Sequence, residues 1–135
     1  MKPNIYNFFK FLEEKENRPI PLKAKFLHAP ETLTPEELDV KGNLNLRNTP
    51  ITSLPKGLTV GGWLDLINTP ITSLPEGLTV GGDLDLENTE ITSLPEGLKV
   101  KRNLWVENTP LANKTDEEIK AMIGPNGYIK DEIYR

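Results

Sequence analysis

The feature that most constrains this 135-residue chain is a sequence repeat with a period of twenty residues. Residues 72–91 read TSLPEGLTVGGDLDLENTEI, and most of these letters recur in residues 52–71 and 92–111. The shared frame is V-x-x-x-L-x-L-x-x-T-x-I-x-x-L-P-x-x-L, beginning at Val40, Val60, Val80 and Val100. A degenerate copy precedes it, because residues 35–40 align with residues 55–60, so the repeat covers about residues 33–111. Self-similarity at a short fixed period is typical of a solenoid.

Each L-x-L segment alternates apolar and polar residues, which predicts a short strand with one buried face. A proline follows a buried leucine further along three of the units, and its fixed φ directs the chain into an extended turn rather than a helix. Twenty residues leave no room for a full helix on the return path. We therefore predict that each unit is one strand plus a tight, irregular return, and that the units stack into a solenoid with a parallel sheet on one face.

The frame resembles the leucine-rich repeat family in its shortest form, which matches it at L-x-L and at the later Ile. It departs from the family where the first Leu of the motif falls on Lys41, Gly61, Gly81 or Lys101. The family's buried asparagine position holds Thr49, Thr69, Thr89 or Thr109, so we expect a threonine ladder there, with Asn48, Asn68, Asn88 and Asn108 as the alternative. The segment SLPEGL-x-V-G-G-x-L-D-L is also similar to short repeat proteins of bacteria and their phages, which suggests an origin but no activity.

The two ends of a solenoid expose apolar surface and require caps. Residues 1–32 are predicted to form an N-terminal cap, with a helix over residues 3–16 followed by an extended connector. The favoured interpretation is that this helix packs on the first strand as a cap. The alternative is that it docks into a groove of a partner protein. Residues 112–135 are predicted to form a C-terminal cap, in which Thr115 or Asp116 begins a short helix and Gly124 ends it. For residues 128–135 the sequence is compatible with either a final strand or a short helix.

Stacking in register places equivalent residues of neighbouring units side by side, about 4.8 Å apart. Three outward columns result: Asn43, Trp63, Asp83 and Asn103; Asn45, Asp65, Asp85 and Trp105; and Arg47, Ile67, Glu87 and Glu107. Both tryptophans of the chain then point outward beside clustered carboxylates. Exposed aromatic residues are enriched at protein interfaces, and nearby carboxylates favour a basic partner. The predicted partner-binding residues are Trp63, Trp105, Asp65, Ile67, Asp83, Asp85, Glu87 and Glu107.

Two plainer interpretations stand beside this one. A terminal segment that folds over the sheet would cover one tryptophan and make it a structural residue. Independently of this, the acidic cluster is in the second interpretation simply a solvated face that keeps the protein soluble.

The sequence supplies no constellation for catalysis or cofactor binding. There is no cysteine, so no disulfide, thiolate nucleophile or thiolate metal site is expected. The cluster of Asp65, Asp83 and Asp85 lacks the loop carbonyls and glycine hinge of a calcium site. His28 stands alone in the expected connector, and the repeated VGG lacks the spacing of a phosphate-binding loop. We therefore predict a non-enzymatic protein with no metal, no cofactor and no small-molecule substrate.

Charge is distributed unevenly along the chain. Residues 1–31 hold six basic and four acidic residues, whereas residues 32–135 hold ten and sixteen. An acidic repeat region argues against direct binding to nucleic acid, because attraction to phosphate supplies most of that affinity. Charges interrupt the apolar N-terminal residues before a signal-peptide core can form, and no apolar run approaches a membrane span. These features predict no membrane partner and a cytoplasmic location, the host cytoplasm if the protein is phage-encoded.

Together these features predict a protein–protein interaction module that binds a partner protein through the exposed face of its parallel sheet. The partner should present a basic or mixed surface with room for an aromatic anchor. If the resemblance to phage and bacterial repeat proteins reflects the origin of the chain, an inhibitor or modulator of a host protein is a natural role. The alternatives are a nucleic-acid mimic that occupies the site of a nuclease or other DNA- or RNA-binding protein, and a small secreted bacterial effector.

Overall fold

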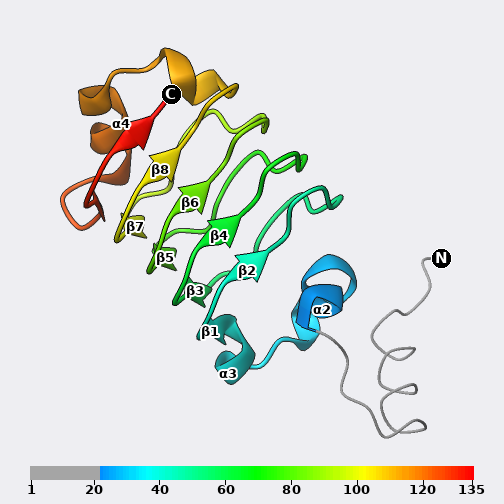
Figure 1. Ribbon diagram of the computed structural model, residues 1–135. Helices are drawn as coiled ribbons and strands as arrows, with labels where there is room; N and C mark the ends of the chain where they lie inside the picture. The colour runs from blue at the N-terminus through cyan, green and yellow to red at the C-terminus, as the bar shows by residue number, and fades with distance from the viewer. Residues whose placement is uncertain (1–21) are drawn as a thin grey trace, which may run out of the picture.

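The computed structural model describes residues 22–135, and its centre is a parallel β-solenoid (Figure 1). Each coil contributes two short strands, which pair into two separate five-stranded parallel sheets. The first sheet contains β1 (Asp39–Val40), β3 (Thr59–Val60), β5 (Thr79–Val80), β7 (Lys99–Val100) and β9 (Tyr128–Ile129). The second contains β2 (Leu44–Asn45), β4 (Leu64–Asp65), β6 (Leu84–Asp85), β8 (Leu104–Trp105) and β10 (Ile133–Tyr134). The predicted repeat solenoid is confirmed, but with two strands per coil instead of one.

The coils stack in register. Leu44 pairs with Leu64, Leu64 with Leu84, and Leu84 with Leu104. The final pairing joins Leu104 to Ile133, so the last coil resumes the same register after an insertion. Residues 128–135 therefore contain strands, β9 and β10, and not the short helix that the sequence also allowed.

Inward-facing aliphatic side chains of successive coils form one continuous core. The L-x-L leucines Leu64 and Leu66 and the following Ile71 have no exposed surface. Leucines of the return path, such as Leu58 and Leu78, are buried beside them. The invariant positions of the repeat are thus the positions that pack against their own copies, which explains why they vary so little.

The threonines at the family's asparagine position form the expected column, and each hydroxyl bonds a backbone carbonyl of its own coil rather than linking neighbouring coils. Thr69 Oγ1 donates to the carbonyl of Leu66 at 2.8 Å, and Thr89 makes the equivalent bond to Leu86. A hydroxyl has one proton to donate, and this bond uses it inside the coil.

An asparagine ladder links the coils instead. Asn48, Asn68, Asn88 and Asn108 all have φ between 55° and 60°. Asparagine adopts this left-handed conformation more readily than most residues. Asn68 Nδ2 donates to Asn48 Oδ1 at 2.8 Å, and Asn88 repeats that bond to Asn68. A carboxamide both donates and accepts, so each side chain can bond to the coil before it and the coil after it.

The repeated VGG forms the corner between the two sheets, where backbones of neighbouring coils approach closely. Gly61 N donates to the carbonyl of Val40 at 2.6 Å, and Gly81 N donates to that of Val60 at 2.7 Å. A Cβ added at Gly61 would lie 2.5 Å from the carbonyl oxygen of Lys41. Only glycine fits there without moving the backbone, so these glycines are packing residues.

At the β1 end, the chain forms α2 (Leu22–His28), the 3₁₀ turn η1 (Pro30–Thr32) and α3 (Pro35–Leu38) (Figure 1). The extended connector predicted after the first helix is therefore wrong for residues 22–28, and His28 ends a helix. Phe26 is buried against the core, and Leu22 packs against it as well. Their spacing of four places both on one helical face, which packs against the core. The helix predicted over residues 3–16 lies outside the described residues.

At the other end, the 3₁₀ turn η2 (Pro110–Asn113) leads into α4 (Asp116–Ile123). Thr115 is the N-cap: its hydroxyl accepts from Glu118 N, and the Glu118 carboxylate accepts from Thr115 N, both at 3.1 Å. Gly124, with φ of 72°, ends the helix as predicted. Ile119 and Ile123 are buried in the core. Within residues 22–135, no helix is long and apolar enough to cross a membrane.

Candidate functional site

The candidate site is a hollow on the outward face of the second sheet, which we call the Trp63 hollow. Its volume is about 450 Å³, and the residues that line it are Asn45, Arg47, Trp63, Leu64, Asp65, Asp83 and Asp85. They come from three successive coils, at and beside strands β2, β4 and β6. A second hollow of about 340 Å³ adjoins it, with Trp63 and Asp83 contributing to both. Trp63 therefore stands between two depressions of the surface.

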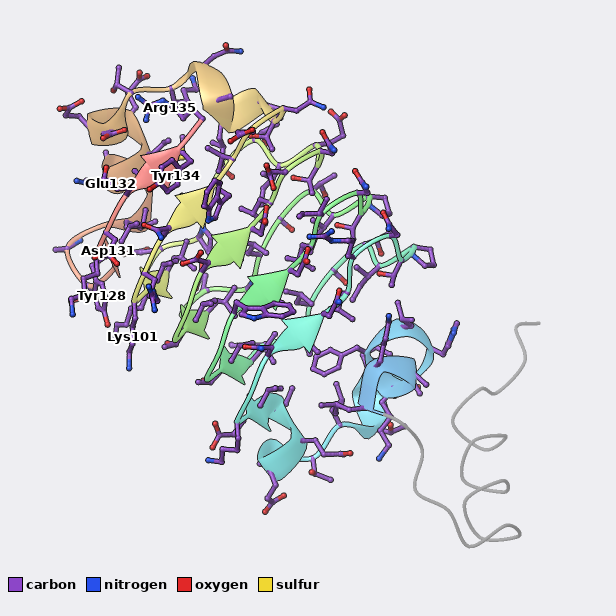
Figure 2. The ribbon with its side chains drawn as sticks, viewed as in Figure 1. Lys101, Tyr128, Asp131, Glu132, Tyr134 and Arg135 are labelled. Atoms are coloured by element: carbon purple, nitrogen blue, oxygen red, sulfur yellow. The ribbon has the colours of Figure 1, made fainter. Side chains whose placement is uncertain are left out.

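The first outward column has a repeated structural role that Trp63 cannot perform. Asn43 Oδ1 accepts a hydrogen bond from the backbone N–H of Trp63 at 2.9 Å. Asp83 Oδ1 accepts in the same way from Asn103 N, and Asn103 Oδ1 from Glu132 N, which lies on the last coil (Figure 2). An indole has no acceptor, so Trp63 loses this link to the next coil. Its side chain is 40% exposed, so core packing does not explain its presence.

In the second outward column, the side chains on β2, β4 and β6 each end their strand with a side-chain turn. Asn45 Oδ1 accepts from Arg47 N at 3.0 Å, Asp65 Oδ1 from Ile67 N at 3.0 Å, and Asp85 Oδ1 from Glu87 N at 3.3 Å. Asparagine and aspartate both form this turn. The turn therefore explains an oxygen acceptor at each position, but not the negative charges at residues 65 and 85.

Asp65 is not the free surface carboxylate that the sequence suggested. Its exposed fraction is 7%. Arg47 reaches its Oδ2 with both Nε, at 3.0 Å, and Nη2, at 2.9 Å. The charge of Asp65 is compensated from the preceding coil, so Asp65 and Arg47 together form one wall of the hollow.

Trp105 is half-buried, unlike Trp63. Its Nε1 donates to Asp83 Oδ2 at 3.1 Å, and its ring stacks on Tyr134 with the centroids 4.1 Å apart. Tyr134 comes from β10 on the last coil (Figure 2). The C-terminal segment does not fold over the sheet, as that interpretation had it, but adds β10 to its edge, where Tyr134 partly covers Trp105. Sequence analysis missed Tyr134, although aligning residues 129–134 with residues 100–105 would have placed it in this column.

Asp85 lies in an unfavourable electrostatic environment. Burial raises the pKa of its carboxyl to about 7, aided by a hydrogen bond with the Glu87 carboxyl and by the negative charges of Glu87 and Asp65. A group with this pKa is partly protonated at neutral pH. An incoming cation would favour its ionised form.

The predicted site residues thus divide into groups. Trp63, Asp65, Asp83 and Asp85 line the hollow together; Glu87 adjoins it through Asp85, and Trp105 through Asp83. Ile67 and Glu107 do not line it. In residues 22–135, no three His, Cys, Asp or Glu side chains are arranged to hold a metal ion.

No protein-family model matches this chain, and no curated protein or solved structure matches it either. Its fold defines it as a parallel β-solenoid repeat protein. The geometry of the outward face is therefore the basis for a functional proposal.

Proposed function

We propose that this protein is a non-enzymatic interaction module of the short leucine-rich-repeat type, with its terminal helices as caps. It binds a partner protein through the outward face of the sheet formed by β2, β4, β6, β8 and β10. If it is of phage or bacterial origin, its role is to inhibit or modulate a host protein in the cytoplasm.

The observation that carries this proposal is the placement of Trp63. A large aromatic side chain is 40% exposed at a position where neighbouring coils use an acceptor to bond the next coil. It therefore forgoes a local hydrogen bond without gaining burial. Exposed tryptophans beside a hollow are typical anchors of protein interfaces, where they bury a large area at low entropic cost.

The charges around Trp63 favour a partner with a basic or mixed surface. Arg47 compensates Asp65, which leaves Asp83, Asp85 and Glu87 as acidic groups at and beside the hollow. Asp83 accepts its hydrogen bonds from the neutral groups of Asn103 and Trp105. Complementary charge speeds association and selects the partner.

Differential capture tests the proposal. The full chain, Trp63→Ala and Tyr128→Ala are each immobilised and exposed to extract of the source cell. Tyr128 is the matched control, because it is also 40% exposed but belongs to the first sheet (Figure 2). We expect the wild type and Tyr128→Ala to retain the same partner protein. Trp63→Ala should bind that partner about 30-fold more weakly, equivalent to about 2 kcal/mol. Equal retention by all three would refute the proposed interface.

A nucleic-acid mimic is the less supported alternative. Such a mimic needs a row of ionised carboxylates, whereas Arg47 compensates Asp65, and burial raises the pKa of Asp85 to about 7. We therefore expect Asp83→Asn to weaken capture less than Trp63→Ala does. The opposite order would favour the mimic.

A further inference from the structure

We propose that the Trp63 hollow receives one arginine side chain of the partner protein, whose guanidinium stacks on the Trp63 indole and pairs with the Asp85 carboxylate. This inference rests on the proposed function and specifies the chemistry of the partner. Its grounds are the aromatic wall, an arginine–aspartate pair already present in the solenoid, and a break in the repeat of that pair.

The aromatic wall suits a planar cation. Trp63 lines the hollow and is 40% exposed, so its ring offers a free surface. Tryptophan gives the strongest cation–π attraction among the aromatic side chains. A guanidinium can lie flat on the indole while its N–H groups point sideways to a carboxylate, which an ammonium cannot do.

The Arg47–Asp65 pair shows how this sheet binds a guanidinium. Arg47 belongs to the third outward column of one coil and reaches Asp65 in the second column of the next, at 2.9 Å and 3.0 Å. Asp65 still accepts from the backbone of its own turn. A carboxylate in this column can therefore hold a guanidinium without disturbing the turn.

One coil further along, Asp85 occupies the equivalent position, but no arginine stands where Arg47 would be. Asp85 is paired in register with Asp65 and makes the same turn bond. The position equivalent to Arg47 is Ile67, which cannot donate to a carboxylate. The side-chain partner of Asp85 is instead another carboxyl, that of Glu87. A guanidinium from outside would therefore give Asp85 the partner that Arg47 gives Asp65.

The size of the hollow fits this occupant. Its volume of about 450 Å³ lies in the range of roughly 300–1,000 Å³ that small-molecule sites occupy. This is room for a side chain, while the surrounding sheet face contacts the segment that carries it.

A peptide titration tests the inference with the full chain. The probes are acetylated and amidated pentapeptides Gly-Gly-X-Gly-Gly, in which X is arginine, lysine or citrulline, and the readout is the indole N–H signal of Trp63 by NMR. Citrulline has the shape of arginine without its charge. We expect the arginine peptide to shift the signal saturably, the lysine peptide to bind at least threefold more weakly, and the citrulline peptide not to bind. Equal binding of arginine and citrulline peptides, or no saturable shift, would overturn the inference.

Variants of the chain locate the cation. Asp85→Asn keeps the turn acceptor and should weaken arginine-peptide binding at least fivefold. Glu76→Gln, the same change of charge on the exposed return path, should leave it unaltered. Ile67→Arg should place a guanidinium beside Asp85 and abolish binding, whereas Ile67→Gln should not. Amide spectra confirm that each variant is folded; wild-type affinity in folded Ile67→Arg would contradict the proposed position.

The two proposals fail differently. If Trp63→Ala loses a captured partner but arginine and citrulline peptides behave alike, the interface stands and the arginine receptor is rejected. If the arginine peptide binds as expected but Trp63→Ala retains every captured protein, the hollow is a guanidinium site outside the partner interface, and the inference in its stated form is rejected.

Discussion

Trp63 and Trp105 illustrate how one residue type takes two roles within a repeat. Trp105 has a hydrogen-bond acceptor in Asp83 and a stacking partner in Tyr134. Trp63 lies two coils earlier in the neighbouring column and keeps an exposed ring. The difference arises from their neighbours, because equivalent positions on adjacent coils become lateral contacts. Of the two, Trp63 is therefore the stronger interface residue.

Asp85 gives a prediction about stability and pH. Its pKa is raised from 3.8 to about 7 in the folded protein, so the folded state binds more protons than the unfolded state between these values. Stability therefore falls as pH rises from about 4 to 7 and stays reduced above 7. Asp85→Asn keeps the turn acceptor and removes the charge. We expect it to raise the free energy of unfolding at pH 8 by on the order of 1 kcal/mol, since the half-buried group is partly screened by water, and to change little at pH 3.

Urea denaturation at pH 3 and pH 8 checks this expectation. Asp65→Asn is the matched comparison, because it removes a carboxylate that Arg47 compensates. It should lower stability at pH 8, by about 1 kcal/mol or less. If Asp85→Asn also lowers stability at pH 8, the unfavourable environment assigned to Asp85 is wrong.

At the scale of the structural element, the asparagine ladder joins coils through side chains alone. Asn68 donates to Asn48 and accepts from Asn88, and its φ is 58°. Two physical effects coincide at this position: the inter-coil hydrogen bonds and the tolerance of the left-handed backbone. Substitution can separate these effects. Glycine loses the hydrogen bonds but tolerates positive φ, whereas alanine loses the hydrogen bonds and does not tolerate positive φ.

We expect Asn68→Ala to lower the free energy of unfolding by about 2 kcal/mol, because it loses two exposed hydrogen bonds and strains the backbone. Asn68→Gly should cost about 1 kcal/mol, since glycine adopts positive φ without strain. Chemical denaturation of the two variants gives the comparison. An equal loss in both would mean that backbone strain contributes nothing here.

At the scale of the whole molecule, the strands of each coil within residues 22–135 pair with those of the coils on either side of it. Central strands such as β6 are paired on both sides, whereas β9 and β10 end their sheets. Helices α2 and α4 lie at opposite ends of the stack (Figure 1). Stability in such an array is close to a sum of units and interfaces, so the ends open more easily than the centre.

Amide hydrogen exchange should reveal this gradient. The N–H groups of Leu84 and Leu86, bonded to Asn103 and Trp105, should exchange at least tenfold more slowly than those of Tyr128 and Lys130 on the last coil. Native-state exchange followed by NMR measures all four. Uniform protection along the array would show that the solenoid opens as one cooperative unit.

The sequence by itself determined the period, the inward columns and the register, because these depend on a pattern that each coil repeats. It also determined that α4 ends at Gly124, and limited its N-cap to Thr115 or Asp116, since capping chemistry is local. The outward placement of Trp63 followed from the same periodicity. Local patterns of this kind can be read without knowing what lies across the fold.

Only the tertiary structure decided which side chains meet. Residues 22–28 form a helix whose Leu22 and Phe26 pack on the core, a surface that exists only after the coils stack. Asp65 is compensated by Arg47, eighteen residues away in sequence, and Trp105 is covered by Tyr134, which follows the insertion containing α4. The partner of a polar or aromatic side chain depends on spatial neighbours rather than on sequence neighbours. The columns could therefore be predicted, whereas the free ring of Trp63 and the carboxyl partner of Asp85 could not.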